Sequence, residues 1–555
     1  MRLLDWVVLC GSLVVIVLYG LWKGRGSDTT KSYLLAGKTM PWYAMALSIM
    51  ATQASAITFI STTGQSYVDG MRFVQFYFGL PLAMILISAF AVPIFHRANV
   101  YTAYEYLEYR FDAKTRALVS AIFLLQRGLA VGVALYAPAV VLTVILGWPD
   151  QWTSLVMGVL VSIYTVLGGI KAVTWTDVQQ MGIMMIGLVG ALVAALTLLP
   201  ADVTLTDALH IAGAAGRLNP VVWNFDLNDR YNVWSGLIGG MFLALAYFGC
   251  DQSQVQRYLT GKSIAQSKLG LLFNAVAKIP MQFLILFVGA MVFVFYTFER
   301  PPLLFQQIQL EQARSAQGYS TVEQRYNEAF ERRKTAARSL AEASRAGDEA
   351  AIAAKTSEYR AAQADLDAAR SEAARLAGSG VLNDTNYIFL TFVTRYLPAG
   401  VVGLILAAVF AAAMSTASAE INSLATVTVI DIYKRHFRPD STDRHYLRVS
   451  QTATAFWSLY AVVTAQYGKN LGSLIEAVNM LGSLFYGGLL GVFALAFFFP
   501  RVTGRGAFYG VLAGEAAIFA AHLFTGISFL WYNVLGSVVV IITGVLLSKL
   551  ERRKA

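Results

Sequence analysis

Oxygen-bearing side chains inside long apolar segments are the residues of this sequence with the clearest chemistry. One group lies in Ala51–Thr58 and a second lies in Ala411–Asn422. In the second group, Ser415, Ser418 and Asn422 follow one another at i, i+3 and i+7, which places their oxygens on one face of a helix. Backbone carbonyls and hydroxyls suit an alkali cation that sheds its water and must later leave. The pattern therefore indicates a monovalent cation site, with close helix packing through small residues as the competing interpretation.

Ionisable residues inside apolar segments form a second set of functional candidates, because a charge in a membrane is costly. Arg127 is interpreted either as functional or as the structural partner of a carboxylate. Lys278 either faces a carboxylate substrate or pairs with Asp251 or Glu476. The sequence shows no metal-ligand spacing, phosphate-binding loop or nucleophile constellation, so we expect a protein that is not an enzyme. The full set is Arg127, Asp177, Asp251, Lys278, Glu420, Glu476 and Glu515.

The composition requires a membrane environment for these residues. The 555 residues are 57% hydrophobic and only 14% charged, whereas soluble domains are about a quarter charged. So few charges could not cover the surface of a soluble protein of this length, which excludes a soluble enzyme and a nucleic-acid binder. The net charge of +10 is then assigned to loops beside the bilayer rather than to nucleic acid. The sequence predicts an all-α polytopic membrane protein whose surroundings are lipid.

About thirteen apolar runs are long enough to cross a bilayer, which takes about 20 residues. Lys and Arg are concentrated in the loops that share a side with the C-terminus. Because such loops are cytoplasmic, we expect the N-terminus outside and the C-terminus inside the plasma or inner membrane. The predicted runs are 4–22, 41–61, 73–96, 117–147, 151–169, 176–199, 232–253, 269–297, 399–431, 447–467, 471–499, 506–525 and 529–548.

A polar insert over 299–384 divides the transmembrane part into 1–298 and 385–555. Strong helix formers on either side of Ala346-Gly347-Asp348 predict a helical hairpin on the outer side, and Ser320 with Glu323 predicts a capping box at its start. Two interpretations of the hairpin remain open, a solvated spacer and an element that contacts a protein partner.

Four segments resemble the sodium:solute symporter family, nearest to its iodide, monocarboxylate and vitamin carriers. They are Tyr101–Phe111, Tyr164–Gln179, Asp251–Tyr258 and the ninth run ending in Asp431–Lys434. The resemblance implies a five-plus-five inverted repeat in which two helices are interrupted near the bilayer midplane. The interruptions are expected at Ala51–Ala54 and at Tyr247–Asp251, and the insert falls outside the resemblance.

The resemblance also implies a sodium site. Ala51, Ala54 and Ala412 match positions that donate backbone carbonyls, and Ser415 and Thr416 match the paired hydroxyl ligands. Asp177 matches an aspartate beneath that site, which assists sodium release or holds a second sodium. Ser418 matches one hydroxyl of the second site, but Ala419 lacks the next one.

The resemblance defines the solute-binding site less well than the sodium site. Apolar and aromatic residues stand at positions where the sugar carriers of the family have polar groups. Sugar transport is therefore disfavoured, because buried polar groups of a hexose would lack partners. We expect a sodium-coupled symporter that imports a small organic solute or anion by alternating access. The alternatives are a proton-coupled carrier using Asp177 and a transporter-like sensor acting through a partner at the hairpin. The solute-binding candidates are Gln53, Thr58, Phe76, Tyr77, Tyr247, Phe248, Gln252 and Lys278.

Overall fold

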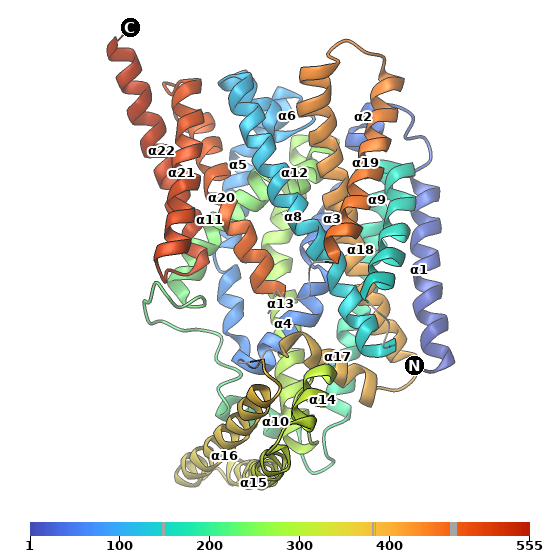
Figure 1. Cartoon of the computed structure of the whole chain (residues 1–555), viewed down its shortest axis with the longest axis vertical. Helices are drawn as coiled ribbons and strands as arrows, with labels where there is room; N and C mark the ends of the chain where they lie inside the picture. Colours follow the sequence, from blue (N-terminus) through green and yellow to red (C-terminus); the bar gives the residue numbers. More distant parts are fainter. Residues whose placement is uncertain (147–149, 380–381, 383, 467–473, 555) are drawn as a thin grey trace.

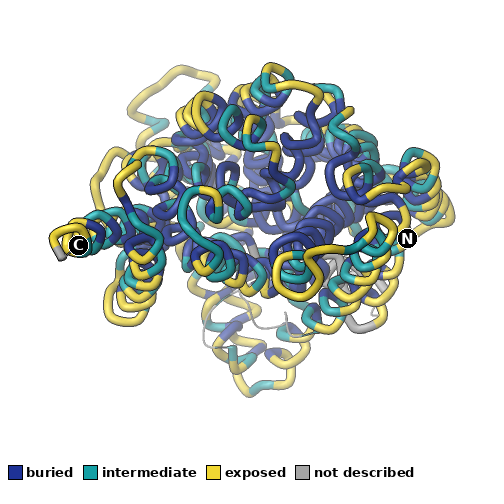
Figure 2. Tube along the Cα trace, turned by 90° about the horizontal axis from the view of Figure 1, so that it is seen from above, coloured by how far each residue is buried: buried dark blue, intermediate teal, exposed yellow. Residues whose placement is uncertain are grey.

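The computed structural model shows a helical bundle with a smaller helical group at one end (Figure 1). It describes the chain except residues 147–149, 380–381, 383, 467–473 and 555. The N-terminus and the smaller group lie toward one end of the bundle, and the C-terminus lies at the other. Buried residues occupy the middle of the bundle and exposed residues its rim (Figure 2).

Apolar helices long enough to cross a membrane number nine among the described residues. Two of these nine segments, Ala56–Ala98 and Trp152–Thr197, are long enough for two crossings each. The shorter Ser235–Gly249 and the more polar α19 supply the remaining two, which gives the thirteen predicted crossings. The predicted ends at 147, 467 and 471 lie outside the described residues. The first half contains α1 (Leu3–Lys23), α3 (Trp42–Gln53), α4 (Ala56–Asp69), η2 (Gly70–Tyr77), α5 (Leu80–Ala89), α6 (Ala91–Ala98), α8 (Ala113–Leu146) and α9 (Asp150–Thr197). The second half contains η3 (Ser235–Gly239), α11 (Gly240–Gly249), α12 (Gln252–Leu259), α13 (Ile264–Phe298), α18 (Val401–Val427), η4 (Thr428–Phe437), α19 (Asp443–Ala465), α20 (Leu474–Phe498), α21 (Gly504–Phe524) and α22 (Phe529–Lys554).

The chain reverses direction inside α9 at Gly169. A Cβ atom on Gly20 of α1 would lie 3.1 Å from Tyr164 Cβ and 2.8 Å from Thr176 Cγ2. Twelve residues of straight helix would separate these two side chains by about 18 Å. Gly169 adopts φ 55° and ψ −154°, which only glycine reaches without strain, and a Cβ there would lie 2.4 Å from the Tyr33 carbonyl oxygen. This glycine therefore makes the two crossings of α9 antiparallel.

Two helices are interrupted in the middle of the bundle, where the sequence predicts it. Between α3 and α4, Ala54 leaves the helical region at φ −86°, ψ 65°, and Ser55 is extended. Between α11 and α12, the helix ends at Gly249, and Asp251 caps the next helix by accepting a hydrogen bond from Ser253 N at 2.8 Å. Both interruptions expose backbone groups to the interior of the protein, which a lipid-facing helix could not do.

The first and last spans pack around this interrupted core. Asp5 at the start of α1 is buried, and its Oδ1 accepts hydrogen bonds from Gly400 N at 2.7 Å and Gly403 N at 3.1 Å. Helices α21 and α22 pack against each other and against α20. Their outward side chains remain exposed, as Leu523 at 70% illustrates, which fits contact with lipid tails.

The polar insert forms the predicted hairpin, and it is docked rather than free. Its two helices pack side by side and contact α10 at the same end of the bundle (Figure 1). The fully buried Arg333 donates to the Tyr296 carbonyl oxygen of α13 at 2.5 Å, and the buried Arg370 donates to Asp384 at 2.6 Å. Arg345 donates to both Asp207 oxygens, with Nε 3.0 Å from Oδ1. The helices at this end are α10 (Leu205–Ala214), α14 (Gln307–Ser315), α15 (Tyr319–Ala346), α16 (Glu349–Leu376) and α17 (Thr385–Tyr396).

Two local predictions in this region differ in outcome. The turn is correct, because Gly347 ends α15 at φ 70° and Asp348 caps α16. The capping box is wrong, because α15 begins at Tyr319 after a left-handed Gly318, so Ser320 lies inside the helix. Glycine can make this sharp entry without a side-chain cap.

Arg116 and Arg257 fall between predicted apolar runs, so the sequence places them in loops on the side of the C-terminus, but both are buried. Arg116 donates to Asp431 at 2.8 Å, and Arg257 is 1% exposed. Both guanidinium groups are paired with carboxylates inside the protein, so they do not contribute to the charge of the loops. The excess of Lys and Arg on the side of the C-terminus persists without them.

Candidate ion and solute site

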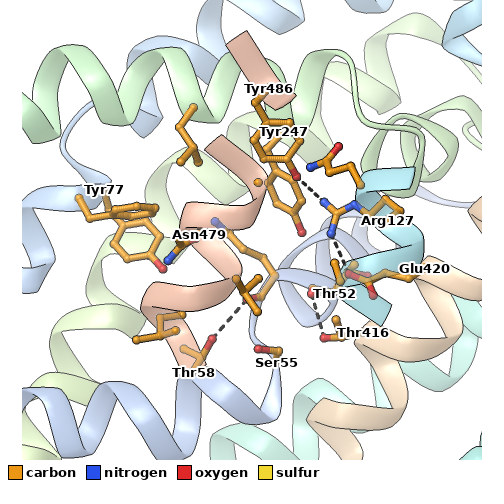
Figure 3. Close-up of a pocket in the computed structure, with 18 residues that line it drawn as sticks. Thr52, Ser55, Thr58, Tyr77, Arg127, Tyr247, Thr416, Glu420, Asn479 and Tyr486 are labelled. Carbon is orange, nitrogen blue, oxygen red and sulfur yellow. Dashed lines mark hydrogen bonds and ion pairs between the residues drawn. The ribbon is translucent and has the colours of Figure 1, made fainter. Parts of the chain in front are cut away.

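A cavity of about 100 Å³ lies between the two interrupted helices (Figure 3). Its wall is formed by the α3/α4 break, η2, α8, α11, α18 and α20. Hydroxyls, amides and aromatic rings dominate it, and Arg127 and Glu420 are the lining residues with a guanidinium and a carboxyl group. The lining residues are Thr52, Gln53, Ser55, Thr58, Phe76, Tyr77, Gln126, Arg127, Ala130, Leu243, Tyr247, Thr416, Glu420, Ile475, Val478, Asn479, Gly482 and Tyr486.

Next to the cavity, two hydroxyls of α18 point at the α3/α4 break and at Asp177. Thr416 Oγ1 donates to the Thr52 carbonyl oxygen at 3.1 Å, which is visible in Figure 3. Ser415 Oγ donates to Asp177 Oδ1 at 2.6 Å, and Ser48 Oγ of α3 donates to Asp177 Oδ2 at 2.5 Å. Helix α18 is thereby held against both α3 and the second crossing of α9 by short polar contacts.

The break itself leaves carbonyl oxygens available. The Thr52 carbonyl accepts from Thr416, and the Gln53 carbonyl accepts from Thr58 at 3.5 Å. Within the described residues, no hydrogen bond is donated to the carbonyls of Ala51 and Ala54. Buried carbonyl oxygens normally have a partner, so these two are suited to a cation.

Asp177 is fully buried with one cation near it. Arg257 Nη2 of α12 lies 3.6 Å from Asp177 Oδ2, and its Nε donates to Thr52 Oγ1 at 2.8 Å. This arginine connects the second interrupted helix to the first one beside Ser48, Thr52, Ser415 and Thr416, which we call the hydroxyl cluster. The guanidinium group of Arg257 partly compensates the charge of the Asp177 carboxylate, to which Ser415 donates its hydrogen bond.

Arg127 connects four elements at the opposite wall of the cavity. Its Nε donates to Asp251 Oδ2 at 2.7 Å, and its Nη1 donates to Glu420 Oε1 at 2.7 Å. Its Nη2 donates to Tyr486 Oη at 2.5 Å and lies 2.6 Å from Asp251 Oδ2. The interpretation of Arg127 as a structural partner for carboxylates is therefore correct, with two partners instead of one.

Of the solute candidates, Gln53, Thr58, Phe76, Tyr77 and Tyr247 line the cavity. The other three do not line it. Phe248 is packed in the core at 1% exposure. Gln252 is occupied by the backbone, because its amide donates to Tyr101 O and accepts from Ala103 N, each at 3.0 Å.

Lys278 of α13 is fully buried, and its Nζ lies 5.4 Å from the ring centroid of Tyr77. The predicted pairing with Asp251 or Glu476 is wrong, since Asp251 binds Arg127 and Glu476 binds Arg230. Its Nζ has no hydrogen-bond partner among the described residues.

Several lining residues were not predicted. Thr52 and Ser55 lie in the segment singled out for its polar residues, so the sequence pointed to the region but not to them. Asn479 and Tyr486 lie on one side of α20 in an otherwise apolar run, and only the packing brings them to the cavity. Arg257 belongs to the Asp251–Tyr258 segment that carries the family resemblance. It follows the end of a predicted run, where a charge is normally solvated, so the sequence places it in a loop and not at the site.

Comparison with known proteins gives the family. The model of the sodium:solute symporter family matches residues 33–306 and 368–514. The chain belongs to the sodium:solute symporter family. It is 30% identical to the human sodium-coupled monocarboxylate transporter 1 over 94% of this chain and 73% of that protein. It is 27% identical to a sodium/sialic acid symporter of Aliivibrio fischeri over 98% of this chain and 92% of that protein.

A solved structure supports the fold of this symporter. A sodium-coupled sialic acid symporter in a substrate-bound outward-open state superimposes with a TM-score of 0.78 at 24% identity, covering 99% of this chain and 98% of that one. The symporter is therefore a multi-pass membrane transporter with sodium as its coupling ion, not an enzyme. Residues 307–367 lie between the two matched ranges, so the middle of the predicted insert falls outside the family model, while 299–306 and 368–384 are matched.

Proposed function

We propose that sodium binds between the α3/α4 break and α18, held by the carbonyls of Ala51, Ala54 and Ala412 and the hydroxyls of Ser415 and Thr416. The observation that carries this assignment is that the Ala51 and Ala54 carbonyls accept no hydrogen bond within the described residues, while the Thr52 carbonyl between them accepts from Thr416 of α18. Neutral oxygens hold a monovalent ion weakly enough to release it.

Asp177 is proposed to serve the release of that sodium. Its carboxylate accepts from Ser415, a proposed ligand, so the ion and the Asp177 carboxylate compete for one hydroxyl. Ser418 donates to the Ser415 carbonyl oxygen at 3.0 Å, and Ala419 offers no hydroxyl, so we propose one sodium per cycle rather than two.

The solute is proposed to bind in the cavity shown in Figure 3 and to enter the cell with sodium by alternating access. A cavity of about 100 Å³ is well below the roughly 300–1,000 Å³ of sites for drug-sized ligands, which favours a small solute. Because Thr52 and Thr416 belong both to the cavity wall and to the hydroxyl cluster, sodium at the cluster fixes one side of the solute site. Binding of each should then strengthen binding of the other by the same factor.

Solute uptake into proteoliposomes tests the coupling. At fixed pH, replacing sodium with choline should abolish uptake and an imposed proton gradient should not restore it. Uptake driven by protons alone would favour the proton-coupled alternative with Asp177 as the carrier. The Asn479→Ala variant, which removes an amide of the cavity wall that is not a proposed sodium ligand, should lower the affinity for the solute more than the affinity for sodium.

The orientation is proposed to be N-terminus and hairpin outside, C-terminus in the cytoplasm of the cell. It is supported by the excess of Lys and Arg in loops at the end of the bundle that holds the C-terminus. Ser320→Cys and Lys549→Cys place a thiol at exposed positions of the two ends. A membrane-impermeant maleimide on whole cells should label the first variant and not the second; the reverse pattern would invert the topology.

For the hairpin, contact with a protein partner is proposed, and a spacer is the competing role. Rigid docking on α10 and α13 supports the first role, because it holds the outer face in a fixed position. That face carries exposed ion pairs such as Arg332 with Asp365 at 3.0 Å. Cross-linking in cells should give products that the charge reversal Arg332→Glu removes while uptake persists; an unchanged product pattern would leave the spacer.

A further inference from the structure

Glu420 is a carboxylate at the cavity wall, and one of its two oxygens accepts no hydrogen bond from the described residues. It is 4% exposed and comes from α18, one turn after Thr416, so it stands between the hydroxyl cluster and Arg127 (Figure 3). Its Oε1 accepts from Arg127, but its Oε2 has no hydrogen-bond partner among the described residues. A buried carboxylate oxygen without a donor is costly, so a donor from the transported solute would relieve that cost.

Arg127 is poorly available to a solute carboxylate, although it lines the same cavity. Three of its five N–H groups point at Asp251 and Tyr486, and a fourth points at Glu420. A bidentate clamp on a carboxylate needs two parallel N–H donors. One remaining N–H on Nη1 cannot supply that clamp.

Arg127 is shared between two carboxylates, because it pairs with Asp251 at 2.6 Å and with Glu420 at 2.7 Å. Glu420 therefore does not have this guanidinium group to itself. Among the fully buried side-chain atoms of the lining, Gln53 Oε1 and Gln126 Oε1 also lack a hydrogen-bond partner in the described part of the chain, and both are acceptors. Lys278 does not line the cavity, and its Nζ lies against the Tyr77 ring.

We propose that Glu420 recognises a protonated amino group, so that the solute is a small amine or amino acid rather than a simple monocarboxylate. The solute ammonium donates to Glu420 Oε2, while Oε1 keeps its bond to Arg127. The inference rests on the proposed function, because it takes the cavity of Figure 3 as the solute site. It sets this chain apart from the relatives that are named as monocarboxylate transporters.

Matched pairs of small solutes test this directly on the purified full-length protein. The panel contains alanine with lactate, β-alanine with 3-hydroxypropionate, 4-aminobutyrate with butyrate, and ethanolamine with ethylene glycol, each with sodium or choline. Thermal stabilisation that needs sodium should be confined to amino members. Stabilisation by lactate or butyrate equal to that of the amino partner would overturn the inference, and so would the absence of a shift with every amine.

The variant Glu420→Gln carries the second arm of the test. Gln keeps an acceptor for Arg127, and Arg127 keeps Asp251, so the fold retains a neutral pair. The amine hit should bind about 10-fold or more weaker, since a hydrogen bond to a charged group is lost. Glu420→Asp keeps the charge but shortens the side chain, so it should recover part of the affinity. Unchanged amine affinity in Glu420→Gln would refute the role of Glu420.

Glu515→Gln is the matched control. Glu515 of α21 is a second carboxylate in a span, with both oxygens unpartnered in the described part of the chain, and it does not line the cavity. Its substitution should leave solute affinity unchanged. If a sodium-dependent hit responds to Asn479→Ala but not to Glu420→Gln, only this inference fails. If no solute of either kind requires sodium, the proposed function fails as well.

Discussion

Thr416 and Ser415 should respond differently to removal of their hydroxyls, although both are proposed sodium ligands. Thr416 donates only to a backbone carbonyl, that of Thr52, at 3.1 Å. Ser415 donates to Asp177 Oδ1 at 2.6 Å, so Ser415→Ala also deprives a fully buried carboxylate oxygen of its donor. Both variants should lower the affinity for sodium. Thr416→Ala should cost less stability than Ser415→Ala, because it leaves a neutral carbonyl rather than a carboxylate oxygen without its donor.

The expected magnitudes follow from the contacts. Losing one oxygen contact to a charged group costs about 1.5–3 kcal/mol, which corresponds to roughly 10- to 150-fold in the sodium Kd. For Ser415→Ala, a further cost of about 1–3 kcal/mol falls on the sodium-free protein, because Asp177 is left with an unsatisfied oxygen. The double variant should have no measurable sodium dependence in the millimolar range.

Thermal unfolding in a sodium titration measures both quantities on one sample. The midpoint without sodium reports stability, and its rise with sodium concentration reports the Kd. Thr416→Ser keeps the hydroxyl and should remain close to wild type. Ser423→Ala is the matched control on the same helix, because its buried hydroxyl donates only to the Glu420 carbonyl oxygen of its own helix, at 2.8 Å.

A sodium Kd for Thr416→Ala within 2-fold of wild type would remove Thr416 from the site. Equal loss of sodium affinity in Ser423→Ala would show that packing of α18, rather than ligation, sets the response. Loss of stability in Thr416→Ala equal to that in Ser415→Ala would refute the distinction drawn from Asp177.

Two further outcomes are expected. Gly169→Ala should prevent stable folding in the membrane, because its Cβ would meet the Tyr33 carbonyl. The measurement is size-exclusion chromatography in detergent, where the monodisperse peak should be lost. Gly182→Ala is the control and should behave as wild type, because nothing lies near its Cβ. Hydrogen bonds from Arg345 lower the pKa of Asp207 from 3.8 to about 2, so the stability that this contact contributes is complete above pH 4 and is lost as the pH falls toward 2. The melting temperature of wild type should therefore fall more steeply between pH 4 and pH 2 than that of Asp207→Asn. If both melting temperatures fell in parallel, the contact between Arg345 and Asp207 would not contribute this stability.

Much of the architecture could be predicted because it depends on local properties of the chain. Hydrophobic length gives the crossings. The orientation drawn from Lys and Arg in the loops stays a prediction. Both helix breaks were expected from the family resemblance, and the structure places them at Ala54 and directly before Asp251. The hairpin turn at Gly347 is equally local.

Pairing between distant charges could not be predicted in the same way. Arg257 looked like a loop residue until packing buried it against Asp177 and Thr52. Lys278 had two plausible carboxylate partners, and both are occupied by other arginines. Which charge meets which depends on the rotation and depth of each helix, and neither is encoded within a single apolar run.

By itself, the sequence determined that this protein is a helical membrane transporter with a candidate sodium site, because burial in lipid restricts both composition and the placement of oxygens. The tertiary structure alone decided that Arg127 is committed to Asp251 and Glu420, and that one oxygen of Glu420 has no hydrogen-bond partner among the described residues. The physical reason is that charge compensation acts over a few ångströms in space between helices far apart in the chain.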